Sequence, residues 1–158
     1  MIDKNKYTEI DDHLPYQIDY TANFNKSFRR EFQTKFVSEE ITADELTIFY
    51  AIYYDPKISQ SELAKFLFKG KAHVGKILND METRGLIKRV ADTRDNIIIK
   101  RNEITPKGMK IFEKGYVEGL KIKERMKQEF TEDDIIQFIS YLKRYRKVLN
   151  SIVDVKLK

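Results

Sequence analysis

Residues 59–89 read SQSELAKFLFKGKAHVGKILNDMETRGLIKR, and this stretch decides the fold. Ser59 and Glu62 form an S-x-x-E capping box, which predicts that a short helix begins here and runs over 59–67. A glycine-containing turn follows, and apolar residues then recur at helical spacing over 71–84. Two short helices joined by a tight turn are typical of a helix-turn-helix.

A β-hairpin is expected directly after these two helices. Gly85 provides the C-terminal stop of the second helix, and residues 86–90 have the pattern of a short strand. A polar connection over 91–96 leads to a second predicted strand over 97–101. A helix-turn-helix followed by a hairpin is the winged-helix arrangement, which we assign to residues 42–104.

A long helix is expected before this unit, beginning near Leu14 and Pro15 and ending near residue 40. An aromatic residue recurs along it at every fourth position: Tyr16, Tyr20, Phe24, Phe28, Phe32 and Phe36. Because this spacing drifts by about 40° per step on an α-helix, the aromatic side chains cover a wide arc. The arc favours a helix between its own domain and a second subunit, and a thick core within one chain is the alternative.

Capping signals place the remaining helices. Thr42 and Glu45 form a second capping box, which predicts a helix that ends near Tyr54. Thr105-Pro106 and Thr131 predict the starts of two long helices. The predicted fold class is therefore mainly α with a small β-hairpin wing (α+β). It is a winged helix-turn-helix with long N- and C-terminal dimerisation helices, over 14–40 and 105–153.

The ordered set of motifs resembles the MarR (multiple antibiotic resistance regulator) family of winged-helix regulators. Residues 59–89 follow, without a gap, the family pattern S-x-x-x-L-A-x-x-L-x-x-x-x-S-T-V-T-R-x-V-x-x-L-E-x-x-G-L-V-x-R. Residues 92–95 are similar to the D-x-R-D wing of the family, and residues 104–108 to its L-T-x-x-G helix start. The resemblance covers about 14–153 and implies a homodimer that represses transcription from a near-palindromic operator.

The chain departs from the family pattern at several positions. Ala72-His73 stands where many members have Ser-Thr, Gly75 replaces a later Thr, and Asn96-Ile97 replaces an Arg pair. The segment 95–104 is about one residue longer than usual, which predicts a bulge or a longer tip in the wing. These departures leave the operator sequence open.

The positive charge of the chain is concentrated in one window. Residues 69–101 contain nine basic and four acidic side chains, a net charge of +5, and the other 125 residues contain 21 of each. This window coincides with the second helix of the helix-turn-helix and the wing, so it favours binding to double-stranded DNA. The alternatives are a solvated charged face and a winged-helix module that binds a protein without binding DNA.

The residues expected to contact DNA lie on the two short helices and the wing. Lys71, His73 and Lys76 are expected at base edges or phosphates in the major groove, where Ala72 and Gly75 leave room for a close approach. Arg94 is expected in the adjacent minor groove. The full set is Ser59, Gln60, Ser61, Lys69, Lys71, Ala72, His73, Gly75, Lys76, Arg94 and Asn96. The basic run 143–147 is interpreted as the solvated flank of a dimerisation helix, with a second DNA-backbone contact as the alternative.

The resemblance also implies a small aromatic or anionic effector. The residues that would line its pocket are His13, Tyr16, Tyr20, Phe24, Phe49 and Tyr53, with plain core as the alternative. The chain has no cysteine, which excludes disulfides, thiol nucleophiles and thiol sensing. We find no catalytic motif and expect no enzyme activity, cofactor or metal. No window is apolar enough to span a membrane, so we expect a cytoplasmic protein.

Overall fold

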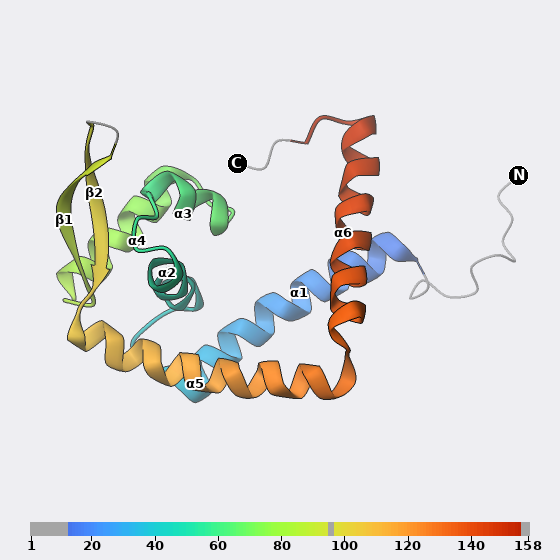
Figure 1. Ribbon diagram of the computed structural model, residues 1–158, viewed down its shortest axis with the longest axis horizontal. Helices are drawn as coiled ribbons and strands as arrows, with labels where there is room; N and C mark the ends of the chain where they lie inside the picture. The colour runs from blue at the N-terminus through green and yellow to red at the C-terminus, as the bar shows by residue number, and fades with distance from the viewer. Residues whose placement is uncertain (1–12, 95–96, 156–158) are drawn as a thin grey trace, which may run out of the picture.

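The computed structural model describes residues 13–94 and 97–155, and the side chains of 92–100 lie outside this description. Figure 1 shows a helical chain with one β-hairpin, as the sequence predicts. The elements are α1 (Leu14–Phe32), the π-helical turn η2 (Gln33–Val37), α2 (Ala43–Tyr54), α3 (Gln60–Phe66), α4 (Lys71–Thr83), β1 (Ile87–Arg94), β2 (Ile97–Ile104), α5 (Pro106–Glu129) and α6 (Glu132–Ile152).

The helices begin where the capping signals predict. The hydroxyls of Thr42, Ser59 and Thr131 each accept a hydrogen bond from the backbone N–H three residues later, and each capping box is complete. Thr105 caps α5 in the same way, with Pro in the first turn. Gly85 follows α4 with a φ of +68°, a left-handed conformation that glycine adopts without steric cost.

The wing is a longer ribbon than the sequence suggests. β1 and β2 have eight residues each, and their antiparallel register runs without a break from Ile87 opposite Ile104 to Arg94 opposite Ile97. The polar connection predicted over 91–96 is therefore wrong for 91–94, which belong to β1. The predicted bulge is also wrong for these pairs, because each residue of β1 is opposite one residue of β2. The alternative of a longer tip concerns residues 95–96, which lie outside the described residues.

The core lies in the winged helix and includes the first half of α5. Phe49 of α2 meets Phe112 of α5 edge-on, with ring centroids 6.4 Å apart, and both side chains are buried. Further core residues come from α2, α3, α4 and β1, and they include Leu46, Ile48, Ile52, Leu63, Val74, Leu78, Met81, Leu86 and Ile87. The core thus fixes α4 and the wing on a common base.

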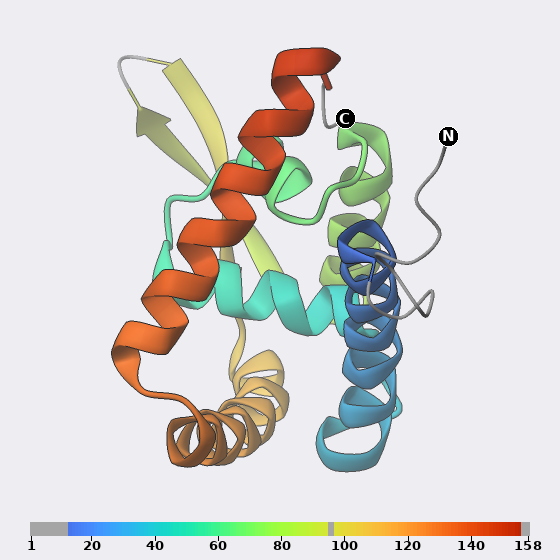
Figure 2. The ribbon, with the colours of Figure 1, turned by 90° about the vertical axis from the view of Figure 1, so that its right-hand side faces the viewer.

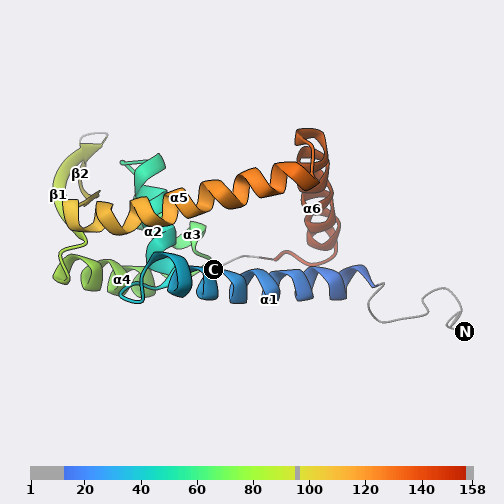
Figure 3. The same cartoon turned by 90° about the horizontal axis from the view of Figure 1, so that it is seen from below.

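Two helical arms extend from this base. We define the N-terminal arm as residues 14–37 and the C-terminal arm as residues 106–152. Figures 2 and 3 show α1, the far half of α5 and α6 reaching away from the winged helix as separate rods. No residue of α1 or α6 is buried.

The N-terminal arm differs from its prediction in two respects. It ends at Val37 rather than near residue 40, because the buried amide of Gln33 donates to the carbonyl of Ser38, whose backbone is extended. Five of its six recurring aromatic residues are exposed and Phe32 is half-buried, so within one chain the alternative of a thick core is wrong.

Candidate nucleic-acid interface

The first two turns of α4 present exposed basic side chains. Lys71, His73 and Lys76 are exposed, and so is Ala72 between them. Within the described part of the chain, neither Lys71 nor Lys76 forms an ion pair. The positive end of the helix dipole adds to the charge of Lys71, so this end of α4 attracts anions.

Gln60 and Gly75 hold α3 against α4. The Gln60 amide donates to the carbonyl of Lys71 over 3.0 Å. A Cβ atom at position 75 would lie 2.8 Å from the Gln60 amide nitrogen, so only glycine fits there without a shift. This corrects our interpretation of Gly75, because Gln60 occupies the space that the missing side chain leaves.

Most basic side chains of the window 69–101 have acidic partners. The Lys69 ammonium lies 2.8 Å from Asp44 of α2, and Lys88 lies 2.7 Å from Glu103. Ion pairs also join Arg84 to Glu45 and Asp80, Arg89 to Glu82, and Arg101 to Glu103. Much of the positive charge is therefore neutralised within the protein, and the sequence count overstates the charge offered to DNA.

The structure leaves a smaller set of unpaired charges than the sequence predicts. Lys71 and Lys76 remain available, whereas the side chains of Arg94 and Lys100 are outside the description. The backbone of Arg94 ends β1, and Asn96 lies outside the described residues. Ser59 and Ser61 are half-buried at the start of α3, where the Ser59 hydroxyl already accepts the backbone N–H of Glu62.

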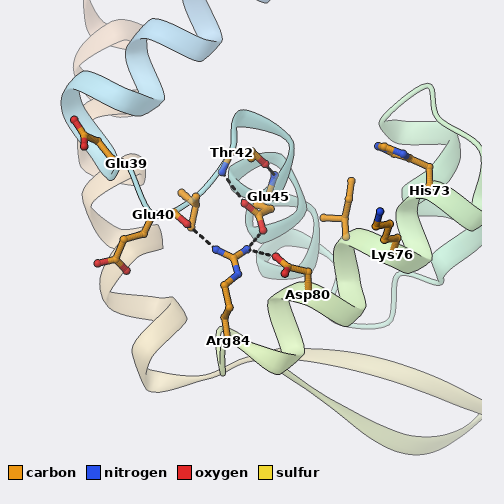
Figure 4. A pocket seen from close by; sticks show the side chains of 10 residues that line it. Glu39, Glu40, Thr42, Glu45, His73, Lys76, Asp80 and Arg84 are labelled. Atoms are coloured by element: carbon orange, nitrogen blue, oxygen red, sulfur yellow. Dashed lines mark hydrogen bonds and ion pairs between the residues drawn. The ribbon is translucent and has the colours of Figure 1, made fainter.

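An open hollow of about 510 Å³ lies beside this surface. Figure 4 shows His73 and Lys76 of α4 on one side and Glu39 and Glu40 of the α1–α2 connection on the other. Between them, Arg84 donates to the Glu40 carbonyl over 2.6 Å and pairs with Glu45 and with Asp80. No spacing in the sequence indicates this network, because its members are far apart along the chain.

Comparison with known proteins identifies the central segment. Residues 40–96 match the MarR family model. The described residues of this segment form the winged helix. No curated protein sequence matches the chain.

Solved structures share the fold over most of the chain. A MepR–DNA complex from S. aureus is 20% identical, with a TM-score of 0.69 over 89% of this chain and 99% of that one. A MarR/EmrR family transcriptional regulator from Acinetobacter sp. ADP1 is also 20% identical, with a TM-score of 0.71 over 90% and 99%. The PcaV transcriptional regulator from Streptomyces coelicolor, in complex with its natural ligand, is 16% identical, with a TM-score of 0.63 over 85% and 95%. The shared fold therefore includes the arms as well as the winged helix.

The predicted effector pocket is not assembled within one chain. Phe49 is fully buried in the core of the winged helix, so its assignment to a pocket is wrong and plain core is right. Tyr53 is 46% exposed, and its ring lies tilted against those of Phe112 and Tyr116, with ring centroids 4.8 and 5.7 Å away. Tyr16, Tyr20 and Phe24 are exposed on the N-terminal arm, and His13 is exposed directly before it. None of the six residues lines the hollow beside α4.

The tyrosines beside Phe112 are perturbed by their surroundings. Tyr50 donates to the carbonyl of Gly115 over 2.8 Å, and burial raises the pKa of its hydroxyl above the ordinary value. A hydrogen bond with Tyr54 raises the pKa of Tyr116. The hydroxyls of Tyr50 and Tyr116 thus stay neutral at physiological pH.

Two other kinds of site were sought in residues 13–94 and 97–155. No three His, Asp or Glu side chains there gather into a group that would hold a metal ion. Over the same residues, no helix combines the length and apolar character needed to cross a bilayer.

Proposed function

We propose that this chain is a DNA-binding transcriptional regulator that represses its target genes as a homodimer on a near-palindromic operator. The observation that carries the proposal is the pair of exposed, unpaired lysines, Lys71 and Lys76, at the start of the second helix of a MarR winged helix. The other basic side chains described in the window 69–101 have acidic partners. Lys71 and Lys76 are therefore the described lysines of this window whose charge is available to DNA.

In the proposed complex α4 enters the major groove, whose width of about 12 Å admits one helix. Lys71 and Lys76 bind phosphates or guanine edges, and His73 reaches the same surface. Ala72 contacts a thymine methyl group, which a small apolar side chain suits. The hydroxyls of Ser59 and Ser61 donate to a backbone phosphate. Lys69 joins them only if it leaves Asp44.

The wing reaches the neighbouring minor groove. Its ladder is regular up to Arg94, so the backbone of this residue is held at the far end of a paired ribbon. An arginine there suits a narrow A-tract minor groove, where the negative potential is enhanced. Asn96 is part of the same proposed contact.

The arms supply the second half of the regulator. Exposed aromatic and aliphatic residues line both, from Tyr16 and Phe24 in the N-terminal arm to Phe138 and Leu149 in α6. Packing them against a second copy places two copies of α4 about one helical turn apart, ~10 bp, on DNA. We propose that a small aromatic or anionic effector also binds in this assembly. It would lie between Tyr53 of the winged helix and His13, Tyr16 and Tyr20 at the start of the N-terminal arm.

A gel shift with a salt titration tests the proposal. The full-length protein is mixed with duplexes from upstream of its own gene and neighbouring genes, and with a scrambled duplex as control. We expect the logarithm of the binding constant to fall linearly with the logarithm of salt concentration, with a slope of about −0.9 per phosphate contacted. Absence of binding at low salt would contradict the proposal and favour a winged-helix module that binds a protein.

A further inference from the structure

Arg84 lies at the junction between the recognition helix α4 and the rest of the molecule. It is the C-cap residue of α4, and its guanidinium contacts three elements at once (Figure 4). It donates to the Glu40 carbonyl in the α1–α2 connection over 2.6 Å, pairs with Glu45 of α2, and lies 2.8 Å from Asp80 of α4.

The Glu45 carboxylate is a fixed partner for this arginine. It is 4% exposed, and its second oxygen accepts the backbone N–H of Thr42 over 2.6 Å as part of the capping box of α2. A buried carboxylate without a counter-charge is unfavourable, so Glu45 holds the Arg84 guanidinium in place. The planar guanidinium offers five donors in fixed directions, which a lysine ammonium cannot reproduce.

The backbone of the same junction binds the C-terminal arm. Lys107, in the first turn of α5, donates its ammonium to the carbonyl of Arg84 over 3.0 Å. The adjacent Thr105 donates to the carbonyls of Gly85 and Leu86 over 2.7 and 3.1 Å. The end of α4 is therefore fastened to the start of α5.

The N-terminal arm reaches Arg84 through the α1–α2 connection. Glu40 follows the arm by three residues, and Arg29 of α1 donates to the side chain of Thr47 and, over 3.3 Å, to the carbonyl of Ala43. The arm and the first turn of α2 are thus tied together, and the Arg84 guanidinium connects this pair to α4.

We propose that Arg84 is a positioning residue whose guanidinium fixes α4 relative to the N-terminal arm and thereby sets the distance between the two recognition helices of the dimer. The proposal rests on the proposed DNA-binding function. Arg84 contacts no DNA itself, since its guanidinium is occupied by Glu40, Glu45 and Asp80. Its effect on DNA binding is therefore geometric: it decides which half-site spacing the dimer accepts.

The test measures spacing preference. Duplexes are selected from a random 30-bp pool, a length estimated to hold two half-sites about one helical turn apart, with the wild-type protein. One base pair is then inserted or deleted between the half-sites. We expect Arg84→Gln to weaken binding to the selected duplex by about tenfold and to bind the spacing variants almost as well as the original. The salt slope should equal that of the wild type, because no phosphate contact is lost.

Two further variants serve as controls, one for loss of folding and one for loss of a phosphate contact. The double variant Arg84→Gln, Glu45→Gln removes the buried carboxylate charge together with its partner. It should accept the altered half-site spacings as Arg84→Gln does, and its cooperative unfolding would show that it is folded. Lys76→Ala should do the opposite, with a shallower salt slope and an unchanged spacing preference.

Each outcome bears on one proposal or the other. Spacing discrimination as sharp as in the wild type, in both Arg84 variants, would overturn the positioning role alone. A shallower salt slope in Arg84→Gln would also overturn it, because Arg84 would then bind phosphate. If the wild-type protein selects no duplex, the DNA-binding function itself fails.

Discussion

The winged helix and the arms treat the same residue types in opposite ways. Phe49 in the winged helix is fully buried, whereas Phe24 in the N-terminal arm is 59% exposed. Basic residues also differ in whether they form ion pairs. Lys69 and Lys88 of the winged helix have acidic partners, whereas the described basic residues of the α6 run 143–147 form no ion pair. The winged helix buries the aromatic side chain of Phe49, and the N-terminal arm leaves that of Phe24 exposed for another surface.

This difference separates folding from assembly. A chain that exposes a row of large aromatic residues along one helix carries an apolar patch of the kind that marks interaction sites. The first half of α5 belongs to the core through Phe112, so the C-terminal arm is attached to a stable base even without a partner. We therefore expect mutations in the two regions to affect different measurements.

The largest effect is expected in the core. Phe49→Ala removes a buried ring that packs on Phe112, and we expect the free energy of unfolding to fall by about 3–5 kcal/mol. Urea denaturation of the full-length protein measures it. The matched change Phe24→Ala, measured at a concentration low enough to give monomer, should cost little. Similar losses for both would mean that α1 is packed within one chain.

The second effect concerns assembly. Phe24→Ala should raise the dimer dissociation constant by about 30-fold, corresponding to about 2 kcal/mol, because it removes an aromatic side chain from the proposed interface. Sedimentation equilibrium over a concentration series checks this. The comparison between the two regions would break down if wild-type protein stayed monomeric at all concentrations, or if Phe24→Ala dimerised equally well.

A third, smaller effect compares the basic residues of α4 and α6 in DNA binding. Lys76→Ala should weaken binding to a recognised duplex by about 1.5 kcal/mol. It should also reduce the salt slope by about 1, because one phosphate contact is lost. Lys143→Ala is the matched control in the α6 basic run, and it should leave both quantities unchanged. A shallower slope for Lys143→Ala would instead assign that run to DNA.

The smallest effect is a pH dependence at the base of the wing. A hydrogen bond from Lys88, with help from Arg101, lowers the pKa of Glu103 below its ordinary value of 4.5. Because the folded pKa is the lower one, this stabilisation is fully present above pH 4.5 and is lost as the pH falls through the folded pKa. Thermal unfolding of wild type and Glu103→Gln should differ at neutral pH and converge in acid. A constant difference would exclude the ion pair as the cause.

Features encoded locally were predictable from the sequence. The capping boxes at Thr42 and Ser59 each involve residues three positions apart, so sequence spacing alone identifies them. Thr131 was predicted only as a helix start, and its box uses Asp134 in place of the usual glutamate. The exposed lysines of α4 follow from the same short-range pattern. The length of the wing was not predictable to the same degree, because a ladder depends on pairing between two strands.

Ion pairs between residues far apart in the sequence could not be predicted from sequence spacing. Asp44 of α2 neutralises Lys69 of the turn between α3 and α4, and Glu45 of α2 pairs with Arg84 at the end of α4. Phe49 failed as a pocket residue for a related reason, since the approach of α5 buries it. A net charge counted along the sequence assigns cations to a window, whereas tertiary structure decides which remain free.

The unbroken register of the wing limits how its length can change. Successive residues of a strand face opposite sides, so removing a single residue from β1 would turn every position beyond it to the other face. Removal of two residues from each strand leaves every remaining side chain on its original face of the ribbon. It shortens the wing by about 7 Å. The length of the wing can therefore change only by two residues per strand at a time. Any such change, designed or evolved, must be made in both strands together.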